Sequence, residues 1–331
     1  MLLYIGIDEA GYGPMLGPLC VGVAALRLDS WRPDDGVPDL WARLEPAVCR
    51  SPKDKKRRLA VADSKKLCKP LAQGKGRLAE AERSVLGFVR AMSGVTPTTD
   101  HELFEALKVT AGSLGWYAGD PSRCPAHADA AEASIASNVL ASTLRDAGVG
   151  VELLRVARID EARFNALLTS GVSGGRSKAN TTLAAIAEHA PAILELIERT
   201  AREHPDTHTR IVLDRQGGRT RYANALSHVF KREITTLAEA TEASTYAFTD
   251  LPRARIRVQA KAEDEHLPVA LASMLAKLVR ELSMERFNAY WSKRRPEIKP
   301  TAGYVTDARR WLADMEGALS DEERRSLVRL A

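Results

Sequence analysis

The sequence predicts an α/β fold in which a mixed sheet is flanked by helices. Short apolar runs of strand length recur along the chain, and residues 2–7 and 19–28 are the first two. Longer segments with apolar residues at helical spacing lie between such runs, for example residues 178–201. Their order combines hairpin-like neighbours with strand–helix–strand crossovers, which is typical of a mixed sheet.

The elements follow in chain order. Residues 2–7 and 19–28 are strand-like and flank a loop rich in glycine and proline, whereas residues 30–62 look irregular. Within the irregular part, the charge run 51–58 is either a solvated loop or a binding segment. The remaining strands are expected at residues 151–159, 209–214 and from 253 into an acidic turn before Pro268, and the helices at about 76–92, 96–108, 129–147, 161–169, 178–201, 220–231 and 268–291. We expect a single domain over residues 1–331.

Composition restricts the class of protein. The chain has 331 residues, of which 45% are hydrophobic, so it can bury a substantial core. A net charge of +5 and a pI near 9.0 favour a polyanionic partner only weakly. Aromatic residues make up 5% of the chain, which argues against an extended base-stacking platform.

The spacing of the cysteines and the lengths of the apolar stretches indicate the cellular compartment. Cys20, Cys49, Cys68 and Cys124 form no CxxC pair and no zinc-binding spacing, which is typical of reduced thiols. No stretch approaches the roughly 20 apolar residues of a membrane helix, and Asp8 comes too early for a signal peptide. We therefore expect a cytoplasmic protein that does not act at a membrane.

Acidic residues stand at the ends of several predicted strands. Asp8 and Glu9 end the first strand, Asp214 ends the strand 209–214, and Asp264 lies between a strand and a proline-started helix. Any one such residue is more often a helix cap or a turn former than a ligand. If several converged, their repulsion would require a cation, and Mg²⁺ takes oxygen ligands of this kind.

Several segments then resemble one family in order. The stretch GIDEAGYGPMLGPLCVG at residues 6–22 resembles the N-terminal signature of the type 2 ribonucleases H, the HII/HIII family. Weaker resemblances follow at DSKKL (63–67), IVLD (211–214), DEHLPVALASMLAKLVRE (264–281) and AGYVTD (302–307). The resemblance implies a ribonuclease H-like sheet and metal-dependent hydrolysis of the RNA strand in RNA/DNA hybrids, leaving 3′-hydroxyl and 5′-phosphate ends.

The resemblance also implies which residues act. It gives a catalytic, metal-binding tetrad of Asp8, Glu9, Asp214 and Asp264 with Mg²⁺ or Mn²⁺ as cofactor. Glu263 competes for the fourth place, because counting back from Pro268 favours Asp264, whereas counting forward from residues 261–262 favours Glu263. We choose Asp264 because the proline marks the start of the helix.

The loop after the first strand is expected to bind substrate. Glycines let backbone amides approach a sugar-phosphate closely, and in the family this loop reads the ribose 2′-hydroxyl. Gly11 and Gly13 match that loop, with Tyr12 between them where HII members usually have arginine. By the same resemblance, Ser64 and Lys65 match a phosphate-contacting segment, and Tyr304 matches a tyrosine that packs on a sugar.

Other departures mark a divergent member of the family. Leu267 stands where tyrosine is usual, and Val305 replaces a glycine. Residues 100–150 have no counterpart and are expected to be a helical insertion, whereas the additional N-terminal domain of the HIII type is not expected. These differences leave the cleavage of a single embedded ribonucleotide open.

Two further features keep more than one interpretation. Arg253, Arg255 and Arg257 share one face of a strand and could form either a phosphate track or a solvated edge. His266 is interpreted as a structural histidine rather than a proton-transfer group. The basic and glycine-rich segments 173–180 and 217–222 could contact a nucleic-acid backbone or be plain turns.

We therefore predict a monomeric endoribonuclease that acts on RNA/DNA hybrids or on ribonucleotide-containing duplex DNA through a two-metal mechanism. Two alternatives remain open from the sequence. One is a non-catalytic hybrid-binding protein, which would gain nothing from carboxylates that face phosphates. The other is a nuclease that acts on another nucleic-acid structure.

Overall fold

The computed structural model describes residues 1–51, 53–54, 58–68, 78–110, 112–169, 178–215 and 219–330. Most of the segment 173–180, part of the charge run 51–58 and the start of the segment 217–222 lie outside these residues. Within the described part, seven strands form one mixed sheet in the order β5-β2-β1-β6-β9-β8-β7. This arrangement confirms the predicted α/β class with a mixed sheet flanked by helices.

The two parallel pairs lie at the centre of the sheet, and antiparallel pairs lie on either side of them. β1 runs antiparallel to β2 and parallel to β6, and β6 runs parallel to β9. The outer pairs, β2 with β5, β9 with β8 and β8 with β7, are antiparallel. The strands are β1 Leu2–Ala10, β2 Leu19–Leu28, β5 Val149–Ile159, β6 His208–Asp214, β7 Ile234–Glu239, β8 Ala243–Phe248 and β9 Ala254–Gln259, with a separate parallel pair of β3 Val48–Cys49 and β4 Leu59–Ala60.

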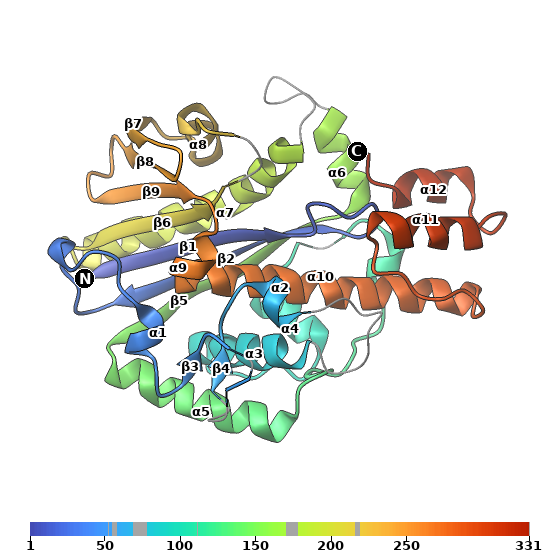
Figure 1. The fold of residues 1–331 in the computed structure, drawn as a ribbon, viewed down its shortest axis with the longest axis horizontal. Coiled ribbons are helices and arrows are strands. Elements are labelled where there is room, and N and C mark those ends of the chain that lie inside the picture. The colour runs from blue at the N-terminus through green and yellow to red at the C-terminus, as the bar shows by residue number, and fades with distance from the viewer. Residues whose placement is uncertain are drawn as a thin grey trace.

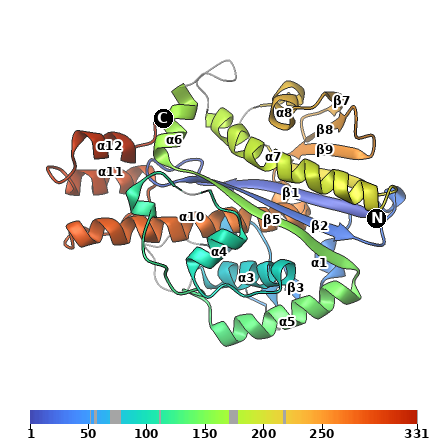
Figure 2. The ribbon, with the colours of Figure 1, turned by 180° about the vertical axis from the view of Figure 1, so that it is seen from behind.

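Helices cover both faces of the sheet, as the two opposite views show (Figure 1 and Figure 2). The long α10 lies along β1 and β2 on one face, with α3 and α5 beyond it, and α7 crosses the other face. The helices are α1 Leu40–Arg43, α2 Ser64–Leu67, α3 Ala79–Ser93, α4 Asp100–Ala106, α5 Ala130–Asp146, α6 Glu161–Thr169, α7 Lys178–Glu203, α8 Ala223–Phe230, α9 Ala262–Glu265, α10 Leu267–Arg294, α11 Val305–Asp314 and α12 Asp321–Leu327, with 3-10 turns η1 Pro33–Asp35 and η3 Gly115–Tyr117.

Gly6 explains how α10 comes so close to the sheet. A β-carbon at Gly6 would lie 2.1 Å from the carbonyl carbon of Pro268 and 2.2 Å from the backbone nitrogen of Val269. Only a residue without a side chain therefore lets the first turn of α10 rest on β1. This contact brings the start of α10 next to the strand that carries Asp8 and Glu9.

Three apolar clusters fill the space between these layers. One lies between the sheet and α10, α3 and α5, and a second lies between the sheet and α6, α7 and α8. A third joins the C-terminal half of α10 to η3, α11 and α12. Leu103 of α4 and Leu140 of α5 belong to the first cluster, so the helices of the expected insertion 100–150 pack into the main core.

The β7–β8 pair is absent from the sequence-based prediction. Only Ile234 of β7 is buried, and its other five residues are exposed. Such an edge strand lacks the alternation of apolar and polar residues on which strand prediction depends.

None of the helices in the described part of the chain has the length and apolar character needed to cross a membrane.

Candidate active site

The parallel pairing of β1 and β6 brings the first three predicted acids together. Ile7 pairs with Leu213, so the next residues, Asp8 and Asp214, lie side by side at the same edge of the sheet. Glu9 follows Asp8 and remains in β1, paired with Val21 of β2. Because both strands end at this edge, the sheet itself fixes the positions of the three carboxyl groups.

Burial and mutual repulsion perturb these carboxyl groups. Burial raises the pKa of Asp8 well above its usual range, and the charges of Glu9 and Asp214 raise it further. Burial and the charge of Asp214 raise the pKa of Glu9 to about 7, whereas the positive charge of Lys65 lowers it. Burial also raises the pKa of Asp214, against hydrogen bonds from backbone N–H groups such as that of Ala262 at 3.1 Å.

The structure favours Glu263 over Asp264 as the fourth acid. The Asp264 carboxylate lies 2.7 Å from Nζ of Lys66, and its side chain is 47% exposed. Burial raises the pKa of Glu263, and the charge of Asp214 contributes, while the charge of Glu263 in turn raises the pKa of Glu9. Glu263 is therefore the residue of this pair that belongs electrostatically to the cluster.

Local geometry explains why counting from the proline pointed to Asp264. Between β9 and α10 the chain makes one helical turn, α9, which begins after Lys261 in a left-handed conformation with φ of 57°. This turn places Glu263 early, next to the end of β6, and directs Asp264 toward α2. The distance from the strand end, rather than from Pro268, sets which carboxylate reaches the site.

The donor set fits a divalent cation. Oε2 of Glu263 is buried and has no hydrogen-bond partner among the described residues, so this oxygen is free to bind a cation. A cation between the carboxylates would lower the raised pKa values of Asp8, Glu9 and Asp214. As the side chains of the described residues stand, no group of three or more His, Cys, Asp or Glu could hold a metal ion, so the carboxylates would have to move closer together to bind one.

Two serines form a chain of hydrogen bonds that ends at the Asp8 carboxylate. Ser273 of α10 donates a hydrogen bond to the Asp8 carboxylate, which lowers the pKa of Asp8 against the effect of burial. Oγ of Ser64 lies 3.0 Å from Oγ of Ser273, and Ser64 is only 4% exposed. Ser64, which was predicted to bind substrate, is thus placed to orient Ser273, because its hydroxyl is enclosed in the protein.

Lys65, next to Ser64, has a different position. The Asp63 carboxylate accepts a hydrogen bond of 2.9 Å from the Lys65 backbone N–H and thereby caps α2. The exposed ammonium of Lys65 lies near enough to lower the pKa of both Glu9 and Asp214. The predicted contact of Lys65 with a substrate phosphate stays a prediction.

The glycine loop, residues 11–18 between β1 and β2, leads away from β1 at the edge of the sheet that carries the carboxylates. Gly11 has φ of +89°, and a β-carbon there would lie 2.5 Å from the Pro18 carbonyl oxygen and 2.9 Å from the Arg280 side chain. A β-carbon at Gly13 would meet no heavy atom within 4 Å. Gly11 is therefore required by the fold, whereas Gly13 leaves open space in which another molecule can approach the backbone.

Tyr12 lies close to the acidic cluster. Burial raises the pKa of its hydroxyl, and the charge of Glu9 adds to this effect. The position between the two glycines thus brings an aromatic hydroxyl, rather than a guanidinium, near the carboxylates.

Tyr304 stands on a separate turn that contacts the glycine loop. Tyr304 is 42% exposed, and its ring lies 5.2 Å from the Arg280 guanidinium and 5.9 Å from Nζ of Lys277. The carbonyl of the preceding Gly303 accepts hydrogen bonds from the N–H groups of Met15 and Leu16, at 2.9 and 3.1 Å. Tyr304 and the glycine loop are therefore held as one unit.

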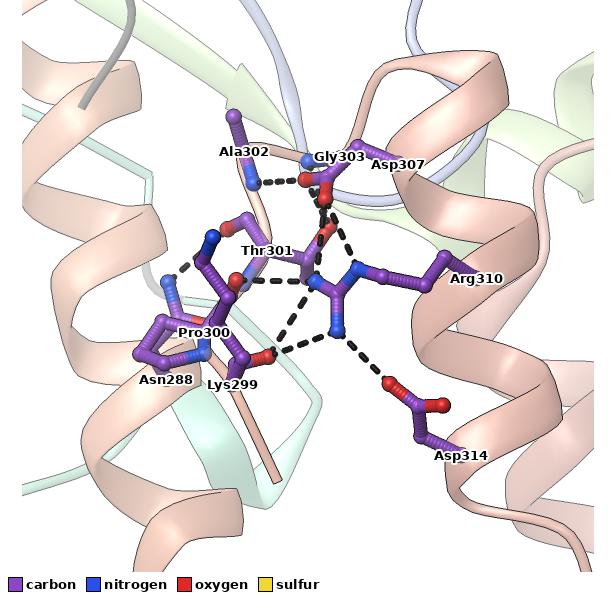
Figure 3. A network of polar contacts seen from close by, with 9 residues as sticks. All are labelled: Asn288, Lys299, Pro300, Thr301, Ala302, Gly303, Asp307, Arg310 and Asp314. Atoms are coloured by element: carbon purple, nitrogen blue, oxygen red, sulfur yellow. Dashed lines mark hydrogen bonds and ion pairs between the residues drawn. The ribbon is translucent and has the colours of Figure 1, made fainter. Parts of the chain in front are cut away.

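A polar network keeps that turn in place (Figure 3). Asp307 accepts hydrogen bonds of 2.7 Å from both Oγ1 of Thr301 and the N–H of Ala302. Asn288 of α10 brackets the backbone of Thr301 with two hydrogen bonds of 2.9 Å. Arg310 donates to the carbonyl groups of residues 299 and 300 and to Asp307.

The sequence is similar to that of a known enzyme. Ribonuclease HII from Azoarcus sp. (strain BH72) is 33% identical over 149 residues, which are 44% of this chain and 67% of that protein. The chain belongs to the ribonuclease HII family. The expected enzyme class, a ribonuclease H, is thereby confirmed, although no protein-family model matches the sequence.

Solved structures of the family are similar at low identity. Ribonuclease H2 from Pyrococcus horikoshii OT3 is 16% identical, with a TM-score of 0.42, over 94% of this chain and 86% of that one. RNase HIII from Bst, described in complex with Mn²⁺, is 15% identical, with a TM-score of 0.42, over 99% of this chain and 66% of that one. Membership of the family rests on the sequence relative.

Proposed function

We propose that this ribonuclease H hydrolyses the RNA strand of RNA/DNA hybrids with Mg²⁺ or Mn²⁺, leaving 3′-hydroxyl and 5′-phosphate ends. The observation that carries the proposal is the convergence of four buried or half-buried carboxyl groups, from Asp8, Glu9, Asp214 and Glu263, beside an open glycine loop. Such a cluster is costly to the fold unless it serves to bind cations.

Each part of the site has a role in this reaction. Bound divalent cations would supply an activated water and neutralise charge on the phosphodiester. Asp8 and Asp214 would hold the cations from the sheet, and Glu9 and Glu263 would complete the oxygen ligands. Ser273 keeps the Asp8 carboxylate oriented, and Lys65 offers a positive charge to the phosphate.

Selection of RNA would come from the loop and the Tyr304 turn. Backbone amides near Gly13 are open to a ribose 2′-hydroxyl, the group that separates RNA from DNA. The exposed ring of Tyr304 offers an apolar surface to a neighbouring sugar. With Tyr12 in place of arginine, the loop lacks one permanent phosphate contact, so we expect runs of ribonucleotides to be cut better than single ones.

The test uses three labelled duplexes: all-DNA, DNA with one embedded ribonucleotide, and DNA with four. Each is incubated with Mg²⁺ or Mn²⁺ and either the wild-type protein or Asp214→Asn. We expect cutting only where ribose is present and only by the wild type, with the four-ribonucleotide duplex preferred. Cutting of all-DNA duplex, or equal cutting by Asp214→Asn, would contradict the proposal.

Location and assembly are proposed separately. We propose a cytoplasmic monomer, a proposal supported by the four free, buried thiols of Cys20, Cys49, Cys68 and Cys124. Size-exclusion chromatography with light scattering tests the monomer: a mass near 36.1 kDa is expected, and a mass of twice that value would exclude it.

A further inference from the structure

The C-terminal segment after α12 sends an arginine beneath the glycine loop. Arg329 is 4% exposed, and its guanidinium donates to the carbonyl of Gly11 at 2.6 Å, of Tyr12 at 3.1 Å and of Gly17 at 3.3 Å. Its own backbone N–H donates to the Met15 carbonyl at 3.0 Å. One residue, more than 300 positions away in the chain, thus contacts the loop at four points.

Two residues of α6, Phe164 and Asn165, hold this arginine in place. The Phe164 ring lies 4.0 Å from the Arg329 guanidinium. Asn165 brackets the arginine's backbone, because its Nδ2 donates to the Val328 carbonyl at 2.8 Å and its Oδ1 accepts from the Leu330 N–H at 2.7 Å. Figure 1 and Figure 2 both show the C-terminus beside α6.

The same helix also reaches the loop directly. Oε1 of Glu161, at the first position of α6, accepts the Gly17 N–H at 2.9 Å. Burial lowers the pKa of Arg329 to about 10, and the Glu161 carboxylate opposes this effect, so the guanidinium remains charged at neutral pH. Only a planar group with several donors can serve three carbonyls at once in this way.

The direction of these carbonyl groups has a consequence for the amides of the loop. In a trans peptide the C=O of one residue and the N–H of the next point in opposite directions. When Arg329 holds the Gly11 and Tyr12 carbonyls inward, the N–H groups of Tyr12 and Gly13 are turned away from it. Neither N–H finds an acceptor in the described part of the chain.

We propose that Arg329 is a positioning residue for the glycine loop: it holds the loop carbonyls so that the Tyr12 and Gly13 amides face the substrate. The inference rests on the proposed function for the identity of that substrate. In this role the C-terminal segment belongs to the substrate site although it does not touch the substrate. The guanidinium of Arg329 lies beneath the loop, whereas the loop itself has tyrosine at position 12.

The experiment compares Arg329→Met and Arg329→Lys with Arg325→Met. Arg325 is an exposed arginine of α12 that donates to the Asp321 carbonyl in its own helix, so its variant controls for lost charge in the same region. Two quantities are measured in the full chain: hydrogen exchange at the Met15, Leu16 and Gly17 amides without substrate, and single-turnover cleavage of the four-ribonucleotide duplex.

We expect Arg329→Met to speed exchange at these three amides and to slow the cleavage step about 10- to 100-fold, because a shift of about 1 Å is costly in an active site. The Kd for the hybrid, measured with Ca²⁺ in place of Mg²⁺, should change less than about threefold, since phosphate contacts elsewhere dominate affinity. Arg329→Lys should fall between Arg329→Met and the wild type, and Arg325→Met should match the wild type.

Other outcomes overturn the inference. Slower cleavage with unchanged loop exchange, or unchanged values of both, would show that Arg329 does not position the loop. If Arg329→Met fails to fold, Asn165→Ala decides, since it keeps the guanidinium but frees its backbone: wild-type exchange and cleavage in that variant would refute the proposal. A wild-type protein that cuts no ribose-containing duplex, yet loosens its loop in Arg329→Met, would refute the proposed function alone.

Discussion

Two regions that carry carboxylates are built in different ways. Asp8, Glu9 and Asp214 lie on β1 and β6, where the register of neighbouring strands fixes their positions. Glu263 and Asp264 lie on α9, a single turn of four residues between β9 and α10. In the sheet, a residue's position follows from counting along the strand, whereas in the turn an additional residue changes which side chain faces the site.

The largest effect should come from the sheet half of the comparison. Asp214→Asn is expected to lower single-turnover cleavage by about 10³-fold or more, because loss of a charged ligand removes several kcal/mol of stabilisation. The metal-free protein should gain about 0.5–2 kcal/mol of stability, since one repelling charge disappears.

The stability and the metal affinity of Asp214→Asn are both measured on one preparation. Thermal unfolding in EDTA reports the stability, and Mg²⁺ titration calorimetry reports the loss of metal binding. The asparagine Oδ1 can still accept the hydrogen bond from the Ala262 N–H, so the local backbone should not change. A variant that is less stable than the wild type would mean that the Asp214 charge supports the fold rather than straining it.

The turn half is tested by the two adjacent acids. Glu263→Gln should reduce cleavage by about 10²-fold, because its buried carboxylate oxygen is a predicted ligand. Asp264→Asn should reduce cleavage by less than about fivefold, since it removes only an exposed ion pair with Lys66, and such pairs are worth at most about 1 kcal/mol. The reverse order of the two effects would return the fourth place to Asp264.

This pair shows how far the sequence could predict the site. The family resemblance, together with the position of each residue at the end of an apolar run of strand length, pointed to Asp8, Glu9 and Asp214, and their catalytic role stays a prediction. The choice between Glu263 and Asp264 could not be made from the sequence, because Lys261 adopts a left-handed conformation that no local pattern of residues reveals. The contacts of Arg329 and Asn165 could not be predicted for a different reason: they join segments far apart in the chain, and nothing near either residue in the sequence indicates them.

The same limit applies to the fold. β1, β2 and β6 have mostly buried residues, and their apolar runs predicted them. β7 is almost entirely exposed, so its position depends on pairing with β8 and not on its own composition. The contact between Ser64 and Ser273 could not be predicted either, since the two residues lie 209 positions apart in the chain.

The third prediction concerns pH and acts on the cluster as a whole. The folded-state pKa of Glu9, about 7, lies above its ordinary value of 4.5. The metal-free folded state therefore binds this proton more tightly than the unfolded chain. The contribution to stability is fully present below about pH 4.5 and is lost as the pH rises through about 7.

Activity should have the opposite dependence, because cation binding needs the deprotonated carboxylates. At limiting Mg²⁺ we expect cleavage to fall about tenfold per pH unit below pH 7, and added Mg²⁺ should move the midpoint to lower pH. Unfolding in EDTA and cleavage rates are both measured from about pH 4 to 8. A cleavage midpoint near pH 4.5 that does not respond to Mg²⁺ would show that the cluster is not perturbed as described.

The smallest effect tests how the helix α10 supports the sheet. Ser273→Ala removes the hydroxyl that donates to Asp8, and the expected loss is about 3- to 10-fold in cleavage, corresponding to one hydrogen bond. The pH midpoint should rise in this variant, because Asp8 loses a group that lowers its pKa. Ser64→Ala should have a smaller effect of the same sign, since Ser64 contacts Ser273 rather than the carboxylate.

A double-mutant cycle separates this chain of contacts from two independent contributions. If Ser64 acts only by orienting Ser273, the double variant should cleave at the rate of Ser273→Ala alone. Additive losses would mean that Ser64 has a role of its own, and the most direct one is the phosphate contact that the family resemblance implied. The enclosed position of Ser64, only 4% exposed, favours the first result.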